Sequence, residues 1–162
     1  MKESELNTII TRSIKINSNF GHKLSDQSYD QKPFDGFGII NNKPAYFESK
    51  LLKNDFKSFN FNIIEDHQYI NLTNIDSQLK DLPHYSLITL GIWIPRKLFY
   101  TFFFDINFIK LTKENGKNSF LKKELLEWVE KEKYLPVVNT EINNKKYKTI
   151  DLQKLDGVII NG

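Results

Sequence analysis

Two neighbouring stretches, FDGFGII at residues 34–40 and PAYFESKL at residues 44–51, decide the fold of this chain. Both are rich in large apolar residues that favour strands, and the Asn41-Asn42 pair between them is typical of a hairpin turn. Side chains of a strand alternate between its two faces, so Glu48 and Lys50 point the same way. The sequence therefore predicts two antiparallel strands, the second of which presents an acid and a base side by side.

The setting of Glu48 and Lys50 distinguishes them from similar pairs elsewhere. An acid two residues before a lysine also occurs at Asp30/Lys32 and Asp55/Lys57, but only Glu48/Lys50 lies inside an alternating apolar run. The hairpin would also bring Asp35 close to Glu48 on one face. The pattern alone fits two interpretations: a solvent-facing ion pair on an edge strand, which contributes little, or a site with a function.

The functional interpretation predicts a metal site. Two carboxylates repel each other unless a positive charge lies between them, and hard oxygen ligands suit Mg²⁺ or Mn²⁺. Such an ion can activate water against a phosphodiester, while the ammonium of Lys50 orients the water and stabilises the transition state. Asp35 and Glu48 are thus the candidate metal ligands, and Lys50 is the candidate catalytic lysine.

A glutamine adds to this hypothesis. Gln68 falls in the inward stripe of an expected helix, seven residues after Phe61 and four before Leu72. A buried amide needs hydrogen-bond partners. For Gln68 we expect the partner to be either a group of the candidate site, namely a metal-bound water or the Lys50 ammonium, or the backbone of the core.

The order of the elements predicts an α/β fold with a mixed central sheet flanked by helices. No repeat or linker is visible, so we expect a single domain over residues 1–162. Apolar spacing and capping residues predict helices at 4–16, at 60–82 and from Asn118 or Ser119 through Val129. Further strands are expected at 85–94 and 97–104, separated by Pro95-Arg96, with a short strand pair and a closing segment from Leu135 onward.

Composition excludes several classes of protein. The chain has 162 residues and no cysteine, which removes disulfides, thiolate zinc sites and cysteine nucleophiles, and suits a reducing cytoplasm. No stretch approaches the roughly 20 apolar residues of a spanning helix, and the amino terminus lacks the apolar core of a signal peptide. We therefore expect a cytoplasmic protein without a membrane partner.

Basic charge is concentrated late in the sequence. The net charge is +3, and residues 106–150 hold ten lysines against six glutamates. The densest cluster is Lys145-Lys146-Tyr147-Lys148, where a tyrosine is interleaved with lysines as in surfaces that contact a phosphate backbone. A solvated lysine-rich face is the alternative interpretation of this cluster.

Taken in order, Asp35, FESK at residues 47–50 and FNFNIIEDHQ at residues 59–68 resemble the PD-(D/E)xK nuclease superfamily, and within it the RecU family of Holliday-junction resolvases. The resemblance implies a restriction-endonuclease-like fold. It also implies a metal-dependent DNA endonuclease in which Asp35 and Glu48 bind Mg²⁺, with Mn²⁺ able to substitute. Lys50 would be the catalytic lysine, and Gln68 would close the site.

The same resemblance implies further features. Glu5 would be an additional acidic residue that supports the metal, and His67 is expected to pack as scaffold. The substrate would be branched DNA, and the active form would be a homodimer. The segment 20–34 is shorter than the basic stalk with which the family engages a junction. The sequence therefore leaves open a nuclease of the same superfamily acting on duplex or flap DNA, or a DNA-binding module that does not cleave.

Overall fold

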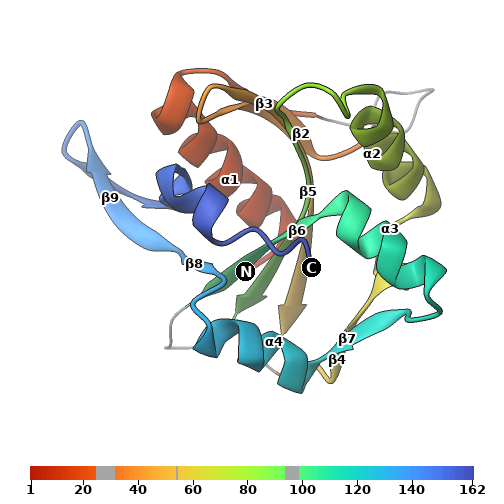
Figure 1. Cartoon of the computed structure of the whole chain (residues 1–162). Helices are drawn as coiled ribbons and strands as arrows, with labels where there is room; N and C mark the ends of the chain where they lie inside the picture. Colours follow the sequence, from red (N-terminus) through yellow and green to blue (C-terminus); the bar gives the residue numbers. More distant parts are fainter. Residues whose placement is uncertain (25–31, 54, 94–98) are drawn as a thin grey trace.

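A six-stranded mixed sheet forms the centre of the protein. The computed structural model describes residues 1–24, 32–53, 55–93 and 99–162. The sheet has the strand order β1-β2-β3-β5-β6-β8 (Figure 1). Its strands are β1 (Gly21–Lys23), β2 (Gly36–Ile40), β3 (Lys43–Lys53), β5 (Tyr85–Trp93), β6 (Tyr100–Asp105) and β8 (Leu135–Pro136). Only β3 and β5 pair in parallel, and the other neighbours are antiparallel.

The hairpin expected from the sequence is present. β2 and β3 pair so that Ile40 lies opposite Lys43, and the two residues between them form the turn. Asn41 and Asn42 both have positive φ angles, 50° and 64°. Asparagine tolerates this left-handed conformation better than most residues do, which explains its use at both turn positions.

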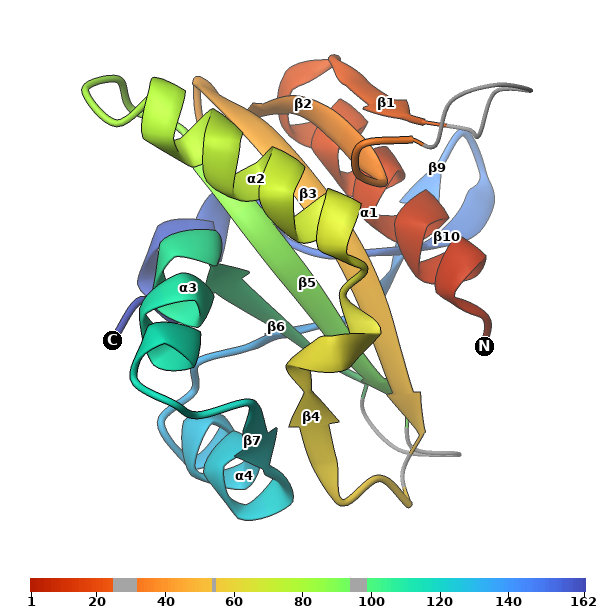
Figure 2. The ribbon, with the colours of Figure 1, turned by 90° about the vertical axis from the view of Figure 1, so that its right-hand side faces the viewer.

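Helices cover both faces of the sheet. Helix α1 (Glu3–Ser18) lies on one face, and α2 (Asp66–Gln78) and α3 (Ile106–Glu114) lie on the other, as Figures 1 and 2 show. Alternation along β5 and β6 divides the core accordingly. Leu87 and Phe103 pack on the α1 side, whereas Ile88 and Phe104 pack on the side of α2 and α3. The expected α/β fold with a mixed sheet between helices is confirmed.

Smaller elements surround this framework. A second, two-stranded sheet joins β4 (Ser58–Asn60) to β7 (Ser119–Leu121), and β9 (Val138–Ile142) pairs with β10 (Lys145–Thr149) as a hairpin. The remaining elements are helix α4 (Lys122–Glu130) and the 3₁₀ turns η1 (Phe61–Ile63) and η2 (Leu152–Gly157). The β9–β10 hairpin and η2 correspond to the strand pair and closing segment expected after Leu135. No helix in the described part of the chain has the length and apolar character needed to span a membrane.

The expectation of one helix over residues 60–82 is wrong. This stretch contains the end of β4, then η1, and α2 begins only at Asp66. Phe59 and Phe61 both pack into an aromatic cluster around Phe120, which requires an extended entry rather than a helix. The side chain of Asn60 then accepts a hydrogen bond from the backbone N–H of Asn62 and caps the 3₁₀ turn.

Two further boundaries differ from expectation. Helix α3 was not expected; Asp105 caps it by accepting a hydrogen bond from the backbone N–H of Asn107, and it buries Ile106 and Ile109. The helix expected from Asn118 or Ser119 begins at Lys122, because residues 119–121 pair with β4 as a strand. In the described residues β6 begins at Tyr100, while the expected Pro95-Arg96 break lies outside the described residues.

Candidate active site

The candidate site lies where β2 begins beside β3. The backbone N–H of Asp35 donates to the carbonyl of Phe47 at 3.0 Å, continuing the β2–β3 pairing by one residue. The Asp35 carboxylate then takes the place of a strand backbone: its Oδ2 accepts the backbone N–H of Ser49 at 2.8 Å. This hydrogen bond fixes the Asp35 side chain against β3 at Ser49, the residue between Glu48 and Lys50.

Glu48 and Lys50 are buried on β3. They pair in register with Ile88 and Leu90 of β5, while the pairing of β3 with β2 stops at Phe47. The Glu48 side chain is fully buried and Lys50 is 6% exposed, while Lys50 Nζ lies 2.9 Å from Glu48 Oε1. The interpretation of these two residues as a solvent-facing ion pair on an edge strand is therefore wrong.

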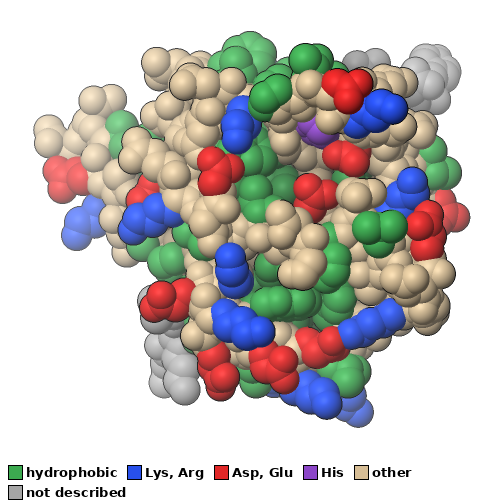
Figure 3. Space-filling view, viewed as in Figure 1, with side chains coloured by type: hydrophobic (Ala, Val, Ile, Leu, Met, Phe, Trp, Pro, Cys, Tyr) green, Lys and Arg blue, Asp and Glu red, His purple; other side chains and the backbone are tan. Residues whose placement is uncertain are grey.

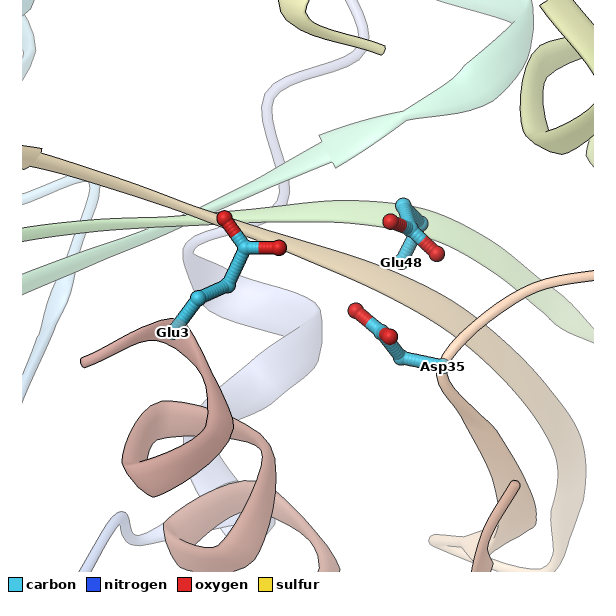
Figure 4. A group of neighbouring side chains, drawn as sticks. All are labelled: Glu3, Asp35 and Glu48. Carbon is cyan, nitrogen blue, oxygen red and sulfur yellow. The ribbon is translucent and has the colours of Figure 1, made fainter. Parts of the chain in front are cut away.

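A third carboxylate completes the group. Glu3 in the first turn of α1 points toward Asp35 and Glu48, and one carboxylate oxygen from each of the three lies within 4.8 Å of the others (Figure 4). Lys50 Nζ is also 3.7 Å from Glu3 Oε1. Three carboxylates from separate elements thus converge beside one buried ammonium group.

Glu5, the residue expected in this role, does not belong to the group; Glu3 occupies that position. Residues two apart on a helix point in widely different directions. Glu3 precedes the buried Leu6 and Ile10 by three and seven residues and therefore lies on the inward stripe of α1. Glu5 instead lines a surface pocket on another side of the helix.

Gln68 connects the lysine to helix α2. Its Oε1 accepts a hydrogen bond from Lys50 Nζ at 3.2 Å and another from the backbone N–H of Glu65 at 3.1 Å. The Lys50 ammonium and the backbone were alternative partners for Gln68, and the structure shows a contact with each. His67 is only partly buried, and its Nδ1 lies 3.3 Å from Glu65 Oε2.

The site alters the ionisation of its own groups. Burial, followed by the negative charge of Asp35, raises the pKa of Glu48 to about 7, although Lys50 acts in the opposite direction. Burial also raises the pKa of Glu3. The pKa of Lys50 is raised as well, because the attraction of Glu48 and Glu3 for the ammonium outweighs its burial. The raised pKa of Glu48 shows that its ionised form is unfavourable in this setting, and a bound cation would stabilise that form.

The donor set fits a divalent metal ion. Within the described residues, the buried Oε2 of Glu48 has no hydrogen-bond partner, which is costly unless a ligand occupies it. Carboxylate oxygens from Glu3, Asp35 and Glu48 are the hard ligands that Mg²⁺ and Mn²⁺ prefer.

Lys32 also touches the group. Its Nζ lies 2.6 Å from Asp35 Oδ1, so Asp35 is held from one side by a lysine and from the other by the Ser49 N–H. Sequence reasoning did not select Lys32 or Glu3. The signal for Glu3 was its phase on the apolar stripe of α1. The contact of Lys32 depends on the path of the chain before Asp35 and had no periodic signal.

The sequence matches no protein-family model and no curated protein. Among solved structures, one that is similar is Archaeoglobus fulgidus Hjc, a Holliday junction resolvase from an archaeal hyperthermophile. The match covers 68% of this chain and 81% of that chain, with 12% sequence identity and a TM-score of 0.40. A similarity at this level concerns the path of the chain, and function has to be judged from the residues of the site.

Proposed function

We propose that this protein is a Mg²⁺-dependent DNA endonuclease of the PD-(D/E)xK type, with residues 1–162 forming one nuclease domain. The observation that carries the proposal is the convergence of Glu3, Asp35 and Glu48 within 4.8 Å beside the buried ammonium of Lys50. Asp35, Glu48 and Lys50 are all buried, whereas Glu3 is exposed. Burying three ionisable groups together is costly, and such clusters are most often found at functional sites.

In the proposed mechanism, Glu3, Asp35 and Glu48 would hold Mg²⁺, which supplies Lewis-acid activation of the scissile phosphate and of a water molecule. Lys50 is held by Glu48 on one side and by Gln68 on the other. From this fixed position its ammonium stabilises the negative charge that develops on the phosphate oxygens. The attacking water would form a bond to phosphorus and lose a proton to solvent, while the bond to the leaving oxygen of the sugar breaks and that oxygen takes a proton from solvent.

Gln68 would act by positioning the lysine. Because its Oε1 is also bound to the backbone N–H of Glu65, the amide is fixed to the start of α2 and cannot turn away from Lys50. A lysine held in one rotamer loses less conformational freedom when the transition state forms.

Branched DNA is the substrate that we propose, with RecU-type cutting of four-way junctions by a homodimer in the cytoplasm. The support is the order of the motif from Asp35 through FESK to His67-Gln68, together with the basic residues of 106–150. A two-fold symmetric junction that is cut twice needs two sites, which a symmetric dimer supplies. Duplex or flap DNA is the alternative substrate, because the segment 20–34 is short.

Cleavage of three labelled substrates in Mg²⁺ or Mn²⁺ tests this proposal: a four-way junction, a duplex with the same arms and a flap. We expect the wild type to cut the junction, and Asp35→Asn and Lys50→Ala to lose at least about 100-fold in rate. Asp81→Asn and Lys80→Ala are matched controls, since both residues are exposed and lie outside the site. Equal activity of the site variants and the controls would refute the catalytic assignment, and preferential cutting of the duplex or flap would refute the junction.

A further inference from the structure

A basic pocket lies next to the candidate site. It has a volume of about 400 Å³ and lies between α1, Lys23 of β1 and strand β10. Four basic side chains and one acidic one line it, Arg12, Lys23, Lys146, Lys148 and Glu5, which gives the lining a net charge of +3. Its basic residues on β10 come from the lysine cluster that the catalytic mechanism does not use.

Arg12 is fixed in this pocket before any ligand binds. Its guanidinium stacks 4.8 Å from the ring centre of Tyr147, and its Nη1 donates to the backbone carbonyl of Lys148 at 3.0 Å. A guanidinium has five N–H donors, so this single hydrogen bond leaves most of them for a ligand. The planar fork of arginine suits a phosphate group, and its fixed position lowers the entropic cost of binding.

The positive charge of the pocket is not neutralised locally. Within the part of the chain that the structure describes, no ion pair joins Arg12, Lys23, Lys146 or Lys148 to a carboxylate. By contrast, blue and red side chains are interspersed along the lower edge of the face in Figure 3, where α4 lies in Figure 1. A hollow with unneutralised basic groups favours an anionic ligand.

The pocket and the carboxylate group share one turn of α1. Ser4 lines the pocket, while the preceding residue, Glu3, belongs to the carboxylate group. α1 lies between the central sheet and the β9–β10 hairpin, as Figures 1 and 2 show. Arg12 is nine residues after Glu3, which corresponds to about 13 Å along the helix axis. This is the axial length of about four base pairs of duplex DNA.

A second hollow extends the basic surface along α1. It has a volume of about 360 Å³, shares Thr8, Arg12 and Lys23 with the pocket and adds Thr11 and Lys15. The two hollows together make a basic track on the outer side of α1. A single small anion would occupy only part of this track, whereas successive backbone phosphates would follow it.

We infer that this track, between α1 and the β9–β10 hairpin, binds backbone phosphates of the duplex arm a few base pairs from the phosphodiester at the carboxylate group. The choice of DNA as the anion rests on the proposed function. The hairpin would then grip the arm and supply affinity that the short 20–34 segment does not. Contacts of this kind position DNA without reading its sequence.

Equilibrium binding in EDTA tests the inference, because no cleavage occurs without divalent ions. The anisotropy of a fluorescein-labelled four-way junction and of a matched duplex is measured over a range of NaCl concentrations. Lys146→Glu/Lys148→Glu is the main variant, since both side chains are exposed and the backbone carbonyl that Arg12 contacts is retained. The control is Lys80→Glu/Lys131→Glu, which makes the same charge change at exposed residues that line neither hollow.

We expect the main variant to bind both DNAs at least about 10-fold more weakly at 0.1 M salt, with the slope of log K against log salt reduced by about 2. The control should change affinity by less than about 2-fold. Arg12→Gln should also weaken binding, with thermal unfolding recorded to show that each variant is folded. Equal affinities for the main variant and the control, or no binding by the wild type, would overturn the inference.

Cleavage is measured separately, so the two proposals can fail independently. If the wild type binds DNA through the track but cuts no substrate, the nuclease proposal is refuted and the track proposal stands. If the wild type cuts DNA and the Lys146→Glu/Lys148→Glu variant binds DNA with unchanged affinity, the track proposal is refuted and the nuclease proposal stands.

Discussion

The carboxylate of Asp35 accepts the backbone N–H of Ser49 at 2.8 Å, and this hydrogen bond ties the residue before β2 to the middle of β3. Asp35 thus has two roles in one side chain. One oxygen maintains the backbone pairing, while the carboxylate as a whole contributes to the group with Glu3 and Glu48. The two roles can be separated by substitution.

Asp35→Asn should fold like the wild type and lose activity, because an amide oxygen can still accept the Ser49 N–H but carries no charge. Asp35→Ala should lose activity and also about 1–3 kcal/mol of unfolding free energy, because the buried N–H of Ser49 is left without a partner. Urea denaturation and cleavage assays on both variants make the comparison. Equal stability of the two variants would contradict the proposed structural role.

Glu3 and Glu5 offer a second comparison within one helical turn. Glu3→Gln removes a carboxylate from the group, so we expect at least about 10-fold weaker Mn²⁺ binding by calorimetry. Glu5→Gln should leave Mn²⁺ affinity unchanged. It should slightly strengthen DNA binding, because Glu5 is the acidic residue among the basic groups of the pocket. The reverse pattern would show that α1 has another rotation about its axis.

Lys32 should oppose metal binding. Its ammonium lies 2.6 Å from Asp35 Oδ1 and repels a cation at the same carboxylate. We expect Lys32→Met to bind Mn²⁺ several-fold more tightly and to be less stable in EDTA, where the three carboxylates then have one fewer positive neighbour. Lys57→Met, at an exposed lysine outside the group, is the control. Unchanged Mn²⁺ affinity in Lys32→Met would show that Lys32 moves away when metal binds.

Stability should depend on pH through Glu48. Its pKa is raised from 4.5 in the unfolded chain to about 7 in the fold, so the folded protein binds the extra proton between these values. The unfolding free energy from this residue is therefore highest below pH 4.5 and falls as the pH rises to about 7, by an amount on the order of a few kcal/mol. Glu48→Gln should remove this dependence.

Mg²⁺ should stabilise the fold most at the pH values where Glu48 is ionised. A cation competes with the proton for the Glu48 carboxylate, so the rise in melting temperature on adding Mg²⁺ should be larger at pH 8 than at pH 5.5. Thermal melts of the wild type and Glu48→Gln at both pH values give the comparison. An equal Mg²⁺ effect at the two pH values would mean that Glu48 is not a ligand.

The strand residues of the site could be found from the sequence because their placement depends on local rules. Alternation put Glu48 and Lys50 on one face, and the Asn41-Asn42 turn brought Asp35 near them. Gln68 was found from its phase relative to Leu72, even though the helix begins at Asp66 and not at residue 60.

Other parts depend on contacts between distant segments. Whether Glu3 or Glu5 faces the strands is set by the rotation of α1 against the sheet. The pairing of β4 with β7 joins segments about 60 residues apart, and it overrides the helical spacing at both places. Helix α3 had a capping aspartate and Ile106 and Ile109 three residues apart, but it follows directly on β6, which masked its start.

The position of Glu3 in the first turn of α1 gives the site one wall that can open. Among the described residues no side chain caps this helix at Lys2, and terminal turns fray at low energetic cost, whereas Glu48 and Lys50 are buried on a strand that pairs with β5. Fraying by a single turn would withdraw one carboxylate and leave the other two in place. Under the proposed function, this asymmetry would let a bound ion or a cut strand leave past the helix end without disturbing the core.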